Sequence, residues 1–282
     1  MRITAPNESP YTFRGTNTYV IGGESVAVID PGPDLPGHLD ALRQAIGGRP
    51  LEAILLTHTH RDHCALAPRL AAETATPLWF AGAHDVSTKP HGAAQAAIRG
   101  EADATLTPAR VLRHGERFGI AGMVLDVHGT PGHCANHLAF GVTGTPYIFT
   151  GDHVMGWSST LIAPPDGSLR DYFSSLDRLI RAPQSQYLPG HGGLIPEGRD
   201  FARALRAHRE GRNRQILAAL QRGPQSVPAL LRAVYPGIAR PLRAAARLTL
   251  EAHIAYLTEQ GQVAMASGLL GAKVRLSGAS EV

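Results

Sequence analysis

Four potential metal ligands stand within six consecutive residues, in the segment His58-Thr59-His60-Arg61-Asp62-His63. This segment directly follows an apolar run, LEAILLT, which is typical of a buried strand that leads into a functional loop. Residues two apart in an extended segment share a face, so His58 and His60 can bind one ion together. The chain then turns toward a helix, and Asp62 and His63 can face a neighbouring ion. An isolated histidine is usually a hydrogen-bonded core residue, but a cluster this dense indicates a metal site.

Three further candidates each follow a predicted strand. His133 ends the motif TPGH, Asp152 lies in TGDH and His191 lies in LPGHG. Each stands beside a glycine that lets the backbone turn tightly. Loops from neighbouring strand ends can converge on one point above a sheet edge. We therefore expect seven side chains to meet there as metal ligands: His58, His60, Asp62, His63, His133, Asp152 and His191.

These side chains predict a particular chemistry. Five imidazoles and two carboxylates form a nitrogen and oxygen donor set that suits two zinc ions, with iron or manganese as alternatives. Two ions about 3.5–4 Å apart can share a bridging hydroxide. A metal lowers the pKa of bound water from ~16 to ~7, which provides a nucleophile at neutral pH. Asp62 can orient that hydroxide as well as bind metal, so we expect it to be catalytic in a hydrolytic reaction.

Other residues near the predicted ligands have structural interpretations. We expect His137 to form hydrogen bonds behind the ligands, and His153 either to do the same or to pack in the core. Cys64 and Cys134 each follow a ligand directly, and we interpret both as small buried residues. Trp157, in the segment GWSST, is the first candidate for a wall of the substrate pocket. Five histidines outside any ligand pattern are interpreted as ordinary residues: His38, His84, His91, His114 and His128.

The elements that must position the ligands alternate between strands and helices. Two short strands are predicted around Gly22-Gly23, and apolar periodicity predicts helices over 36–47, 66–74 and 170–181. Up to about residue 200, this alternation indicates a layered α/β fold. Further strands are predicted at 51–57, 77–80, 123–128, 137–142, 146–150 and 186–189.

The character of the chain changes after about residue 200. Three helices followed by a small hairpin is the order of a winged helix. We therefore predict a catalytic domain at 1–205 and a small winged-helix-like domain at 206–282. The predicted C-terminal elements are helices over 200–222, 227–234 and 241–260 and a hairpin within 262–276.

Charge is divided unevenly between the two parts. Residues 1–200 carry 15 basic and 19 acidic side chains, a net charge of −4, whereas 201–282 carry 12 basic and 4 acidic side chains, a net charge of +8. A basic unit can bind nucleic acid, although an arginine-rich surface is also an ordinary solvated one. Arg243 and Arg247, one turn apart on the predicted second helix of the helix-turn-helix, are the candidates for phosphate contacts.

The composition of the 282-residue chain points to a soluble protein. No apolar run reaches the ~18 residues that can span a bilayer. The first residues, MRITAPNESPYTF, lack the apolar core of a signal peptide. Two cysteines do not build a disulfide framework in a chain of this length. We therefore expect a cytoplasmic protein with no membrane partner.

Five motifs resemble, in the same order, those of the metallo-β-lactamase superfamily. THTHRDH at 57–63 is similar to its HxHxDH signature, and VIDPG at 28–32, TPGH, TGDH and LPGHG match the others. The resemblance implies an αββα sandwich in which Asp30 is structural. It also implies that His58, His60 and His133 bind one metal, that Asp62, His63 and His191 bind the other, and that Asp152 bridges both.

The sequence further resembles the β-lactamase-like protein 2 group of endoribonucleases. YTFRGTNTYVI at 11–21 and RAHREGRNRQIL at 206–217 carry this likeness. It implies cleavage of single-stranded RNA, with the basic C-terminal unit holding the phosphate backbone. The alternative is hydrolysis of a small ester, thioester or lactone, as in glyoxalase II, with the C-terminal unit capping the pocket or forming a homodimer. A non-catalytic regulator that binds DNA is a third hypothesis, and the intact ligand set argues against it.

Overall fold

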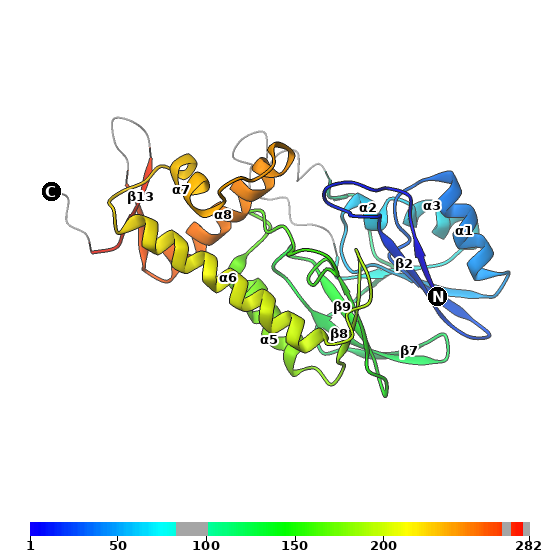
Figure 1. Cartoon of the computed structure of the whole chain (residues 1–282). Helices are drawn as coiled ribbons and strands as arrows, with labels where there is room; N and C mark the ends of the chain where they lie inside the picture. The colour runs from blue at the N-terminus through cyan, green and yellow to red at the C-terminus, as the bar shows by residue number, and fades with distance from the viewer. Residues whose placement is uncertain (83–100, 267–271, 279–282) are drawn as a thin grey trace.

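The computed structural model describes residues 1–82, 101–266 and 272–278. Figure 1 shows two sheets stacked face to face, helices on their outer sides and a group of C-terminal helices at one end. His84, His91 and the turn of the predicted C-terminal hairpin at 267–271 lie outside the described residues. No described helix is both long and apolar enough to cross a membrane.

The first sheet is built from the N-terminal part of the chain. Its first three strands pair antiparallel and the remaining strands pair parallel. Helices α1 (Pro36–Ile46) and α3 (Ala67–Thr74) share a buried apolar cluster with this sheet, and so cover its outer face. The strand order is β1 (Arg2–Thr4), β2 (Asn17–Gly22), β3 (Val26–Ile29), β4 (Leu51–Leu55), β5 (Leu78–Phe80) and β6 (Arg110–Val111).

The second sheet follows in the chain. Helix α5 (Leu169–Arg181) begins at Ser168, whose hydroxyl accepts a hydrogen bond from the Asp171 amide at 3.2 Å. Helices α5 and α6 (Gly198–Leu220) pack on the outer face of this sheet. The strand order is β11 (Gln186–Pro189), β10 (Tyr147–Gly151), β9 (Leu138–Val142), β8 (Met123–Gly129) and β7 (Arg117–Ile120).

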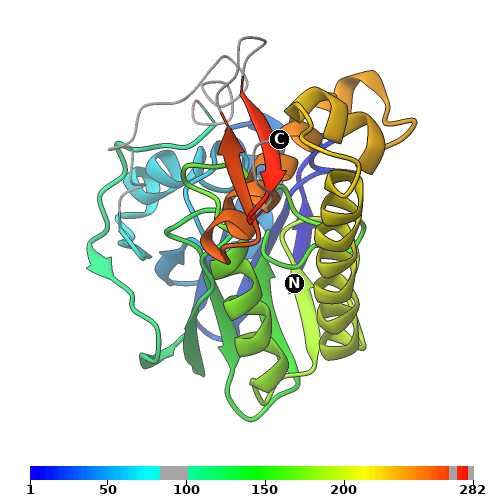
Figure 2. The ribbon, with the colours of Figure 1, turned by 90° about the vertical axis from the view of Figure 1, so that its left-hand side faces the viewer.

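The two sheets face each other across the largest part of the core. Ile29 of the first sheet and Phe140 of the second are fully buried in one cluster. Tyr19 and Phe149 meet edge to face across the interface, with ring centroids 4.9 Å apart. The layers therefore run helix, sheet, sheet, helix, which confirms the predicted sandwich. Figure 1 shows these layers edge-on, and Figure 2 looks at them from the side of α5 and α6, which lie in front of the sheets.

The C-terminal unit has a core of its own. Ile216, Leu230, Ile254 and Val274 belong to one buried cluster. Helix α6 runs without a break through the predicted domain boundary at 205, and its two halves contribute to the second-sheet cluster and to the C-terminal cluster. The division into two domains stays a prediction. After α6 come α7 (Val227–Val234), the 3₁₀ turn η1 (Arg240–Leu242), α8 (Arg243–Glu259), and the antiparallel pair β12 (Val263–Ala266) and β13 (Lys273–Leu276).

The structure adds short elements that the sequence did not predict. Strands β1, β6 and β7 are only two to four residues long, so each is too short for its pattern of apolar residues to stand out in the sequence. Helix α2 (Arg61–Cys64) is a single turn inside the ligand segment. The last long helix begins at Arg243 rather than at residue 241, because η1 precedes it.

Candidate metal centre

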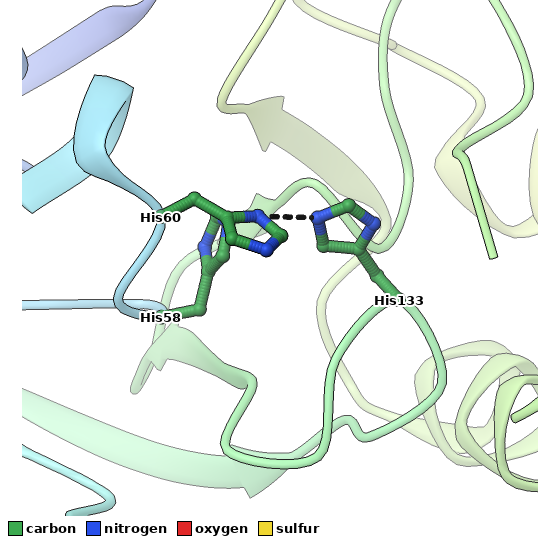
Figure 3. Close-up of side chains that lie close together, drawn as sticks. All are labelled: His58, His60 and His133. Atoms are coloured by element: carbon green, nitrogen blue, oxygen red, sulfur yellow. Dashed lines mark hydrogen bonds between the residues drawn. The ribbon is translucent and has the colours of Figure 1, made fainter. Parts of the chain in front are cut away.

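His58, His60 and His133 form the first group of ligand atoms. His58 and His60 lie in the loop after β4, and His133 lies in the loop after β8. The Nδ1 atom of His60 is 3.0 Å from Nε2 of His58 and 2.9 Å from Nε2 of His133. Figure 3 shows the three rings converging. One ligand atom from each lies within 4.8 Å of the others, so the three can bind one ion.

Asp62, His63 and His191 form the second group. The single turn of α2 carries Asp62 and His63, and His191 follows β11. The Nε2 atom of His191 lies 3.2 Å from Oδ2 of Asp62 and 3.3 Å from Nε2 of His63. Segments that are more than a hundred residues apart in sequence thus meet at the second predicted ion.

Asp152 lies between the two groups. Its Oδ1 atom is 3.2 Å from Nε2 of His63 and 3.3 Å from Nε2 of His191. Its Oδ2 atom is 3.8 Å from Nε2 of His133, on the side of the first group. Each carboxylate oxygen therefore faces a different group, an arrangement that would allow Asp152 to bind both ions. All seven predicted ligands are brought together, and their roles as ligands stay predictions.

The donor set fits a pair of cations. Oδ1 of Asp152 is buried and accepts no hydrogen bond from the described residues, although two imidazole nitrogens lie close to it. Burial raises the pKa of Asp152, but His191 and His63 outweigh it and hold that pKa well below the usual range. A buried carboxylate that stays ionised next to converging nitrogen atoms has the charge and the lone pairs that transition metals bind.

Hydrogen bonds behind the ligands fix the orientation of the imidazoles. Nδ1 of His133 donates to the carbonyl of Leu161 at 2.7 Å, and Nδ1 of His191 donates to the carbonyl of Gly15 at 3.2 Å. A neutral imidazole that donates from Nδ1 carries its lone pair on Nε2, the atom that faces the centre. The hydroxyl of Thr160 also lies 3.0 Å from Nδ1 of His133.

Asp30 lies behind the second group, where its carboxylate holds Thr57 in the strand-end loop. Its Oδ1 atom accepts a hydrogen bond from the Thr57 amide, and its Oδ2 atom accepts one from the Thr57 hydroxyl, both at 2.7 Å. The structural role implied for Asp30 is therefore the one observed. The residue has φ of 50°, a left-handed conformation that aspartate tolerates better than most side chains.

Close packing explains one of the motif glycines. A Cβ atom on Gly190 would lie 2.6 Å from Oδ1 of Asp152 and 2.6 Å from Cε1 of His63. Only glycine lets β11 approach the two ligands this closely. The side-chain amide of Asn17 holds the same turn, because its Nδ2 donates to the carbonyls of Pro189 and Gly192, both at 2.9 Å.

The neighbouring residues separate into supporting and packing roles. Nε2 of His137 accepts a hydrogen bond from the Asp152 amide at 3.1 Å, which confirms its predicted place behind the ligands. His153 packs against the ring of Tyr172, with ring centroids 4.6 Å apart. Cys64 and Cys134 are buried and free, and burial raises the pKa of both thiols, so both are small buried residues as predicted.

A cavity of about 680 Å³ lies over the ligand cluster. Trp157 lines it, as predicted, and stacks on Phe13 with ring centroids 5.1 Å apart. Another part of the wall comes from the C-terminal helices and the segment between them, and the sequence did not predict which of their residues line the cavity. Residues of this wall are Arg209, Tyr235, Ile238, Leu242 and Ala246.

Comparisons with known proteins agree with this geometry. The model of the metallo-beta-lactamase superfamily matches residues 11–191. The Beta-lactamase-like protein 2 homolog of Drosophila melanogaster is 29% identical over 278 residues, which cover 93% of this chain and 89% of that protein. The crystal structure of the metallo-beta-lactamase family protein TTHA1429 from Thermus thermophilus superposes with a TM-score of 0.78 at 26% identity and covers 98% of both chains. TTHA1623 in a di-iron-bound form superposes with a TM-score of 0.55 at 30% identity, over 71% of this chain and 96% of that one.

The family match spans the whole ligand cluster, from before His58 to His191, and the long superposition also includes the C-terminal helices. The chain therefore belongs to the metallo-β-lactamase superfamily, and it is a metal-dependent hydrolase of that fold.

Proposed function

We propose that the chain is a dinuclear hydrolase that cleaves the ester or thioester bond of a small, largely apolar acyl substrate. The observation that carries the proposal is the composition of the cavity. The ligand cluster lies on one side, and apolar side chains such as Met155, Ile238 and Leu242 contribute most of the remaining wall, among fewer polar ones. A concave, mostly apolar pocket with a few converging polar groups is typical of a small-molecule site.

Asp62 is the residue placed to handle the proton. Its side chain is 29% exposed and lines the cavity, whereas Asp152 is 10% exposed. Burial raises the pKa of Asp62, but His63 and His191 lower it below the usual range, so the carboxylate stays ionised. The hydroxyl of Thr16 donates to Oδ2 of Asp62 at 3.2 Å and fixes its orientation. When bound, the cations supply Lewis acidity and an activated water.

The C-terminal unit fits a capping role better than a role in holding RNA. We infer a winged-helix-like arrangement from α6, α7, α8 and the final hairpin. Arg243 and Arg247, the predicted phosphate contacts, are exposed and do not line the cavity. Nε of Arg247 is 3.0 Å from Oε1 of Glu251, so that guanidinium already has an anionic partner. Other residues of the same unit, such as Ile238 and Ala246, line the cavity, which supports a capping role over the metal centre.

The donor set gives the expected metals. Imidazole and carboxylate ligands suit zinc, with iron or manganese as alternatives. Iron in the similar TTHA1623 supports testing more than zinc alone. We therefore propose that zinc, iron and manganese forms of the full chain be prepared in parallel for every assay.

The experiment is a substrate panel with acyl thioesters, acyl esters, lactones and single-stranded RNA. We expect turnover of the thioesters or esters, with kcat/KM rising as the acyl chain lengthens, because longer chains bury more apolar surface in the cavity. Cleavage of RNA without turnover of any acyl substrate would overturn the proposal. Salt-sensitive RNA binding would accompany that outcome.

A matched pair of variants sharpens this test. Ile238→Asp places a charge in the cavity wall, whereas Leu194→Asp places the same charge at a residue that is 44% exposed. We expect Ile238→Asp alone to remove the preference for long acyl chains. Equal kcat/KM profiles for the two variants would contradict a substrate site beneath the C-terminal helices.

A further inference from the structure

Arg209 is a buried cation in the wall of the cavity. The residue is 2% exposed, lies on α6 and lines the same cavity as the ligand cluster. One terminal nitrogen donates to the carbonyl of Thr160, and the guanidinium carbon lies 5.6 Å from the ring centroid of Tyr172. Nε of Arg209 is buried and has no hydrogen-bond partner among the described residues. The guanidinium therefore has a donor, on Nε, that the described part of the fold leaves unused.

No carboxylate among the described residues forms an ion pair with Arg209. Arg206, which precedes it on the same helix, shows the contrast, because Arg206 is paired with Asp177 at 2.9 Å and with Glu210 at 3.1 Å. The carboxylates that line the cavity are elsewhere engaged or exposed: Asp62 and Asp152 contact the imidazoles, and Glu101 is exposed.

The other titratable groups near Arg209 add no negative charge. Burial, Arg209 and Arg212 together lower the pKa of His253 to about 3, so this imidazole is neutral. His208, which also lines the cavity, has its pKa lowered by burial and by the same two arginines. The cation is thus surrounded by neutral groups and by another cation.

A guanidinium stays charged at every pH at which the protein is folded. Burial of such a charge without an anionic partner is strongly unfavourable, and a carboxylate bound in a bidentate manner is the partner that its planar geometry fits best. Since the described part of the fold provides no such partner and leaves the group in the cavity wall, the missing anion belongs to a ligand.

We propose that Arg209 binds a carboxylate carried by the acyl group of the substrate. This inference rests on the proposed hydrolytic function of the same cavity. Thr160 links the two ends of the site, since its carbonyl accepts from Arg209 and its hydroxyl lies 3.0 Å from Nδ1 of His133. The substrate class is therefore an ester or thioester of a dicarboxylic acid, with an apolar spacer between the scissile carbonyl and the distal carboxylate.

The test measures binding rather than turnover. Straight-chain diacids from succinate to sebacate, and the monoamide of each, are titrated into the metal-loaded full chain by calorimetry. Both members of a pair carry one carboxylate for the metal centre, and only the diacid carries a second. We expect the best-fitting diacid to bind roughly ten- to a hundredfold more tightly than its monoamide, because a hydrogen-bonded charge is lost in the amide.

Variants assign this preference to Arg209. Arg209→Gln should bind diacid and monoamide equally, Arg209→Lys should keep part of the preference, and the control Arg206→Gln should keep all of it. Equal affinities in the unmodified protein, or a full preference retained in Arg209→Gln, would overturn the inference. Because the Lys variant keeps a charge and the unmodified protein is itself informative, the test does not depend on the folding of the Gln variant.

The same experiment separates this inference from the proposed function. A diacid preference that depends on Arg209, in a protein that hydrolyses no thioester or ester, would contradict the proposed function and support the binding role. Hydrolysis of uncharged acyl thioesters without any diacid preference would support the proposed function and contradict the binding role of Arg209.

Discussion

Oδ2 of Asp30 lies 2.9 Å from Nδ1 of His63, and both side chains are buried. The carboxylate accepts a hydrogen bond from Nδ1, so that once the ring is neutral the lone pair of Nε2 faces the second group of ligands. Burial lowers the pKa of His63, but the carboxylates of Asp62, Asp152 and Asp30 raise it well above the ordinary value. Asp30, at the end of the third strand, thus fixes the orientation of the His63 ring on α2.

We predict that Asp30→Asn weakens metal binding at the second site by roughly 10–100-fold, because the amide supports His63 less well than the carboxylate does. Asp40→Asn is the matched control, since Asp40 is 64% exposed on α1. Chelator competition with both variants measures the effect. Unchanged affinity in Asp30→Asn would show that the contact with His63 does not support metal binding.

Metal affinity should depend on pH through His191. Burial lowers the pKa of this imidazole, but Asp152 and Asp62 outweigh it and raise the pKa from 6.5 to about 9 in the absence of metal. A metal ion must displace that proton. The apparent affinity should therefore rise by roughly tenfold per pH unit for each displaced proton below about pH 9 and then level off.

The stability of the metal-free protein should fall over the pH range in which the metal affinity rises. A folded pKa that is raised above the unfolded value stabilises the fold fully below pH 6.5, and this contribution is lost as the pH rises through about 9. Chemical denaturation of metal-free protein across this range measures the change. A metal affinity that is independent of pH would contradict the protonation of His191.

Trp157 should contribute to substrate binding more than to chemistry. It lines the cavity and stacks on Phe13 at an interplanar angle of 11°. Replacing its side chain with a smaller one therefore removes apolar surface from the cavity wall and leaves the predicted metal ligands in place. We predict that Trp157→Ala raises KM by roughly tenfold and changes kcat by less than about threefold. Tyr147→Ala, at a residue that is 41% exposed and outside the cavity, is the control. A loss confined to kcat would place Trp157 in the chemical step instead.

The sequence predicts the metal centre because its signals are local. His58 and His60 share a face of one extended segment, and the motif glycines, such as Gly190, stand beside the ligands that they make room for. Strand and helix periodicity predicts the long elements for the same reason. The very short elements, such as α2, contain too few residues to show a period.

The substrate site is different, because long-range packing creates it. Residues such as Ile238 and Leu242 reach the cavity only through the packing of the C-terminal helices beside the loop that holds Trp157. In the sequence, nothing distinguishes Arg209 from the many arginines expected on the surface. Only the fold shows that this residue is buried and forms no ion pair with the described residues. The residues proposed to contact the substrate could therefore be inferred only from the structure.

Metal content tests the central claim most directly. Elemental analysis of unmodified protein, purified without chelators, should find about two transition-metal ions per chain. Asp152→Ala should lose metal and turnover together, because this carboxylate faces both groups of ligands. Protein that contains no transition metal, or an Asp152→Ala variant with full metal content and full activity, would contradict the account.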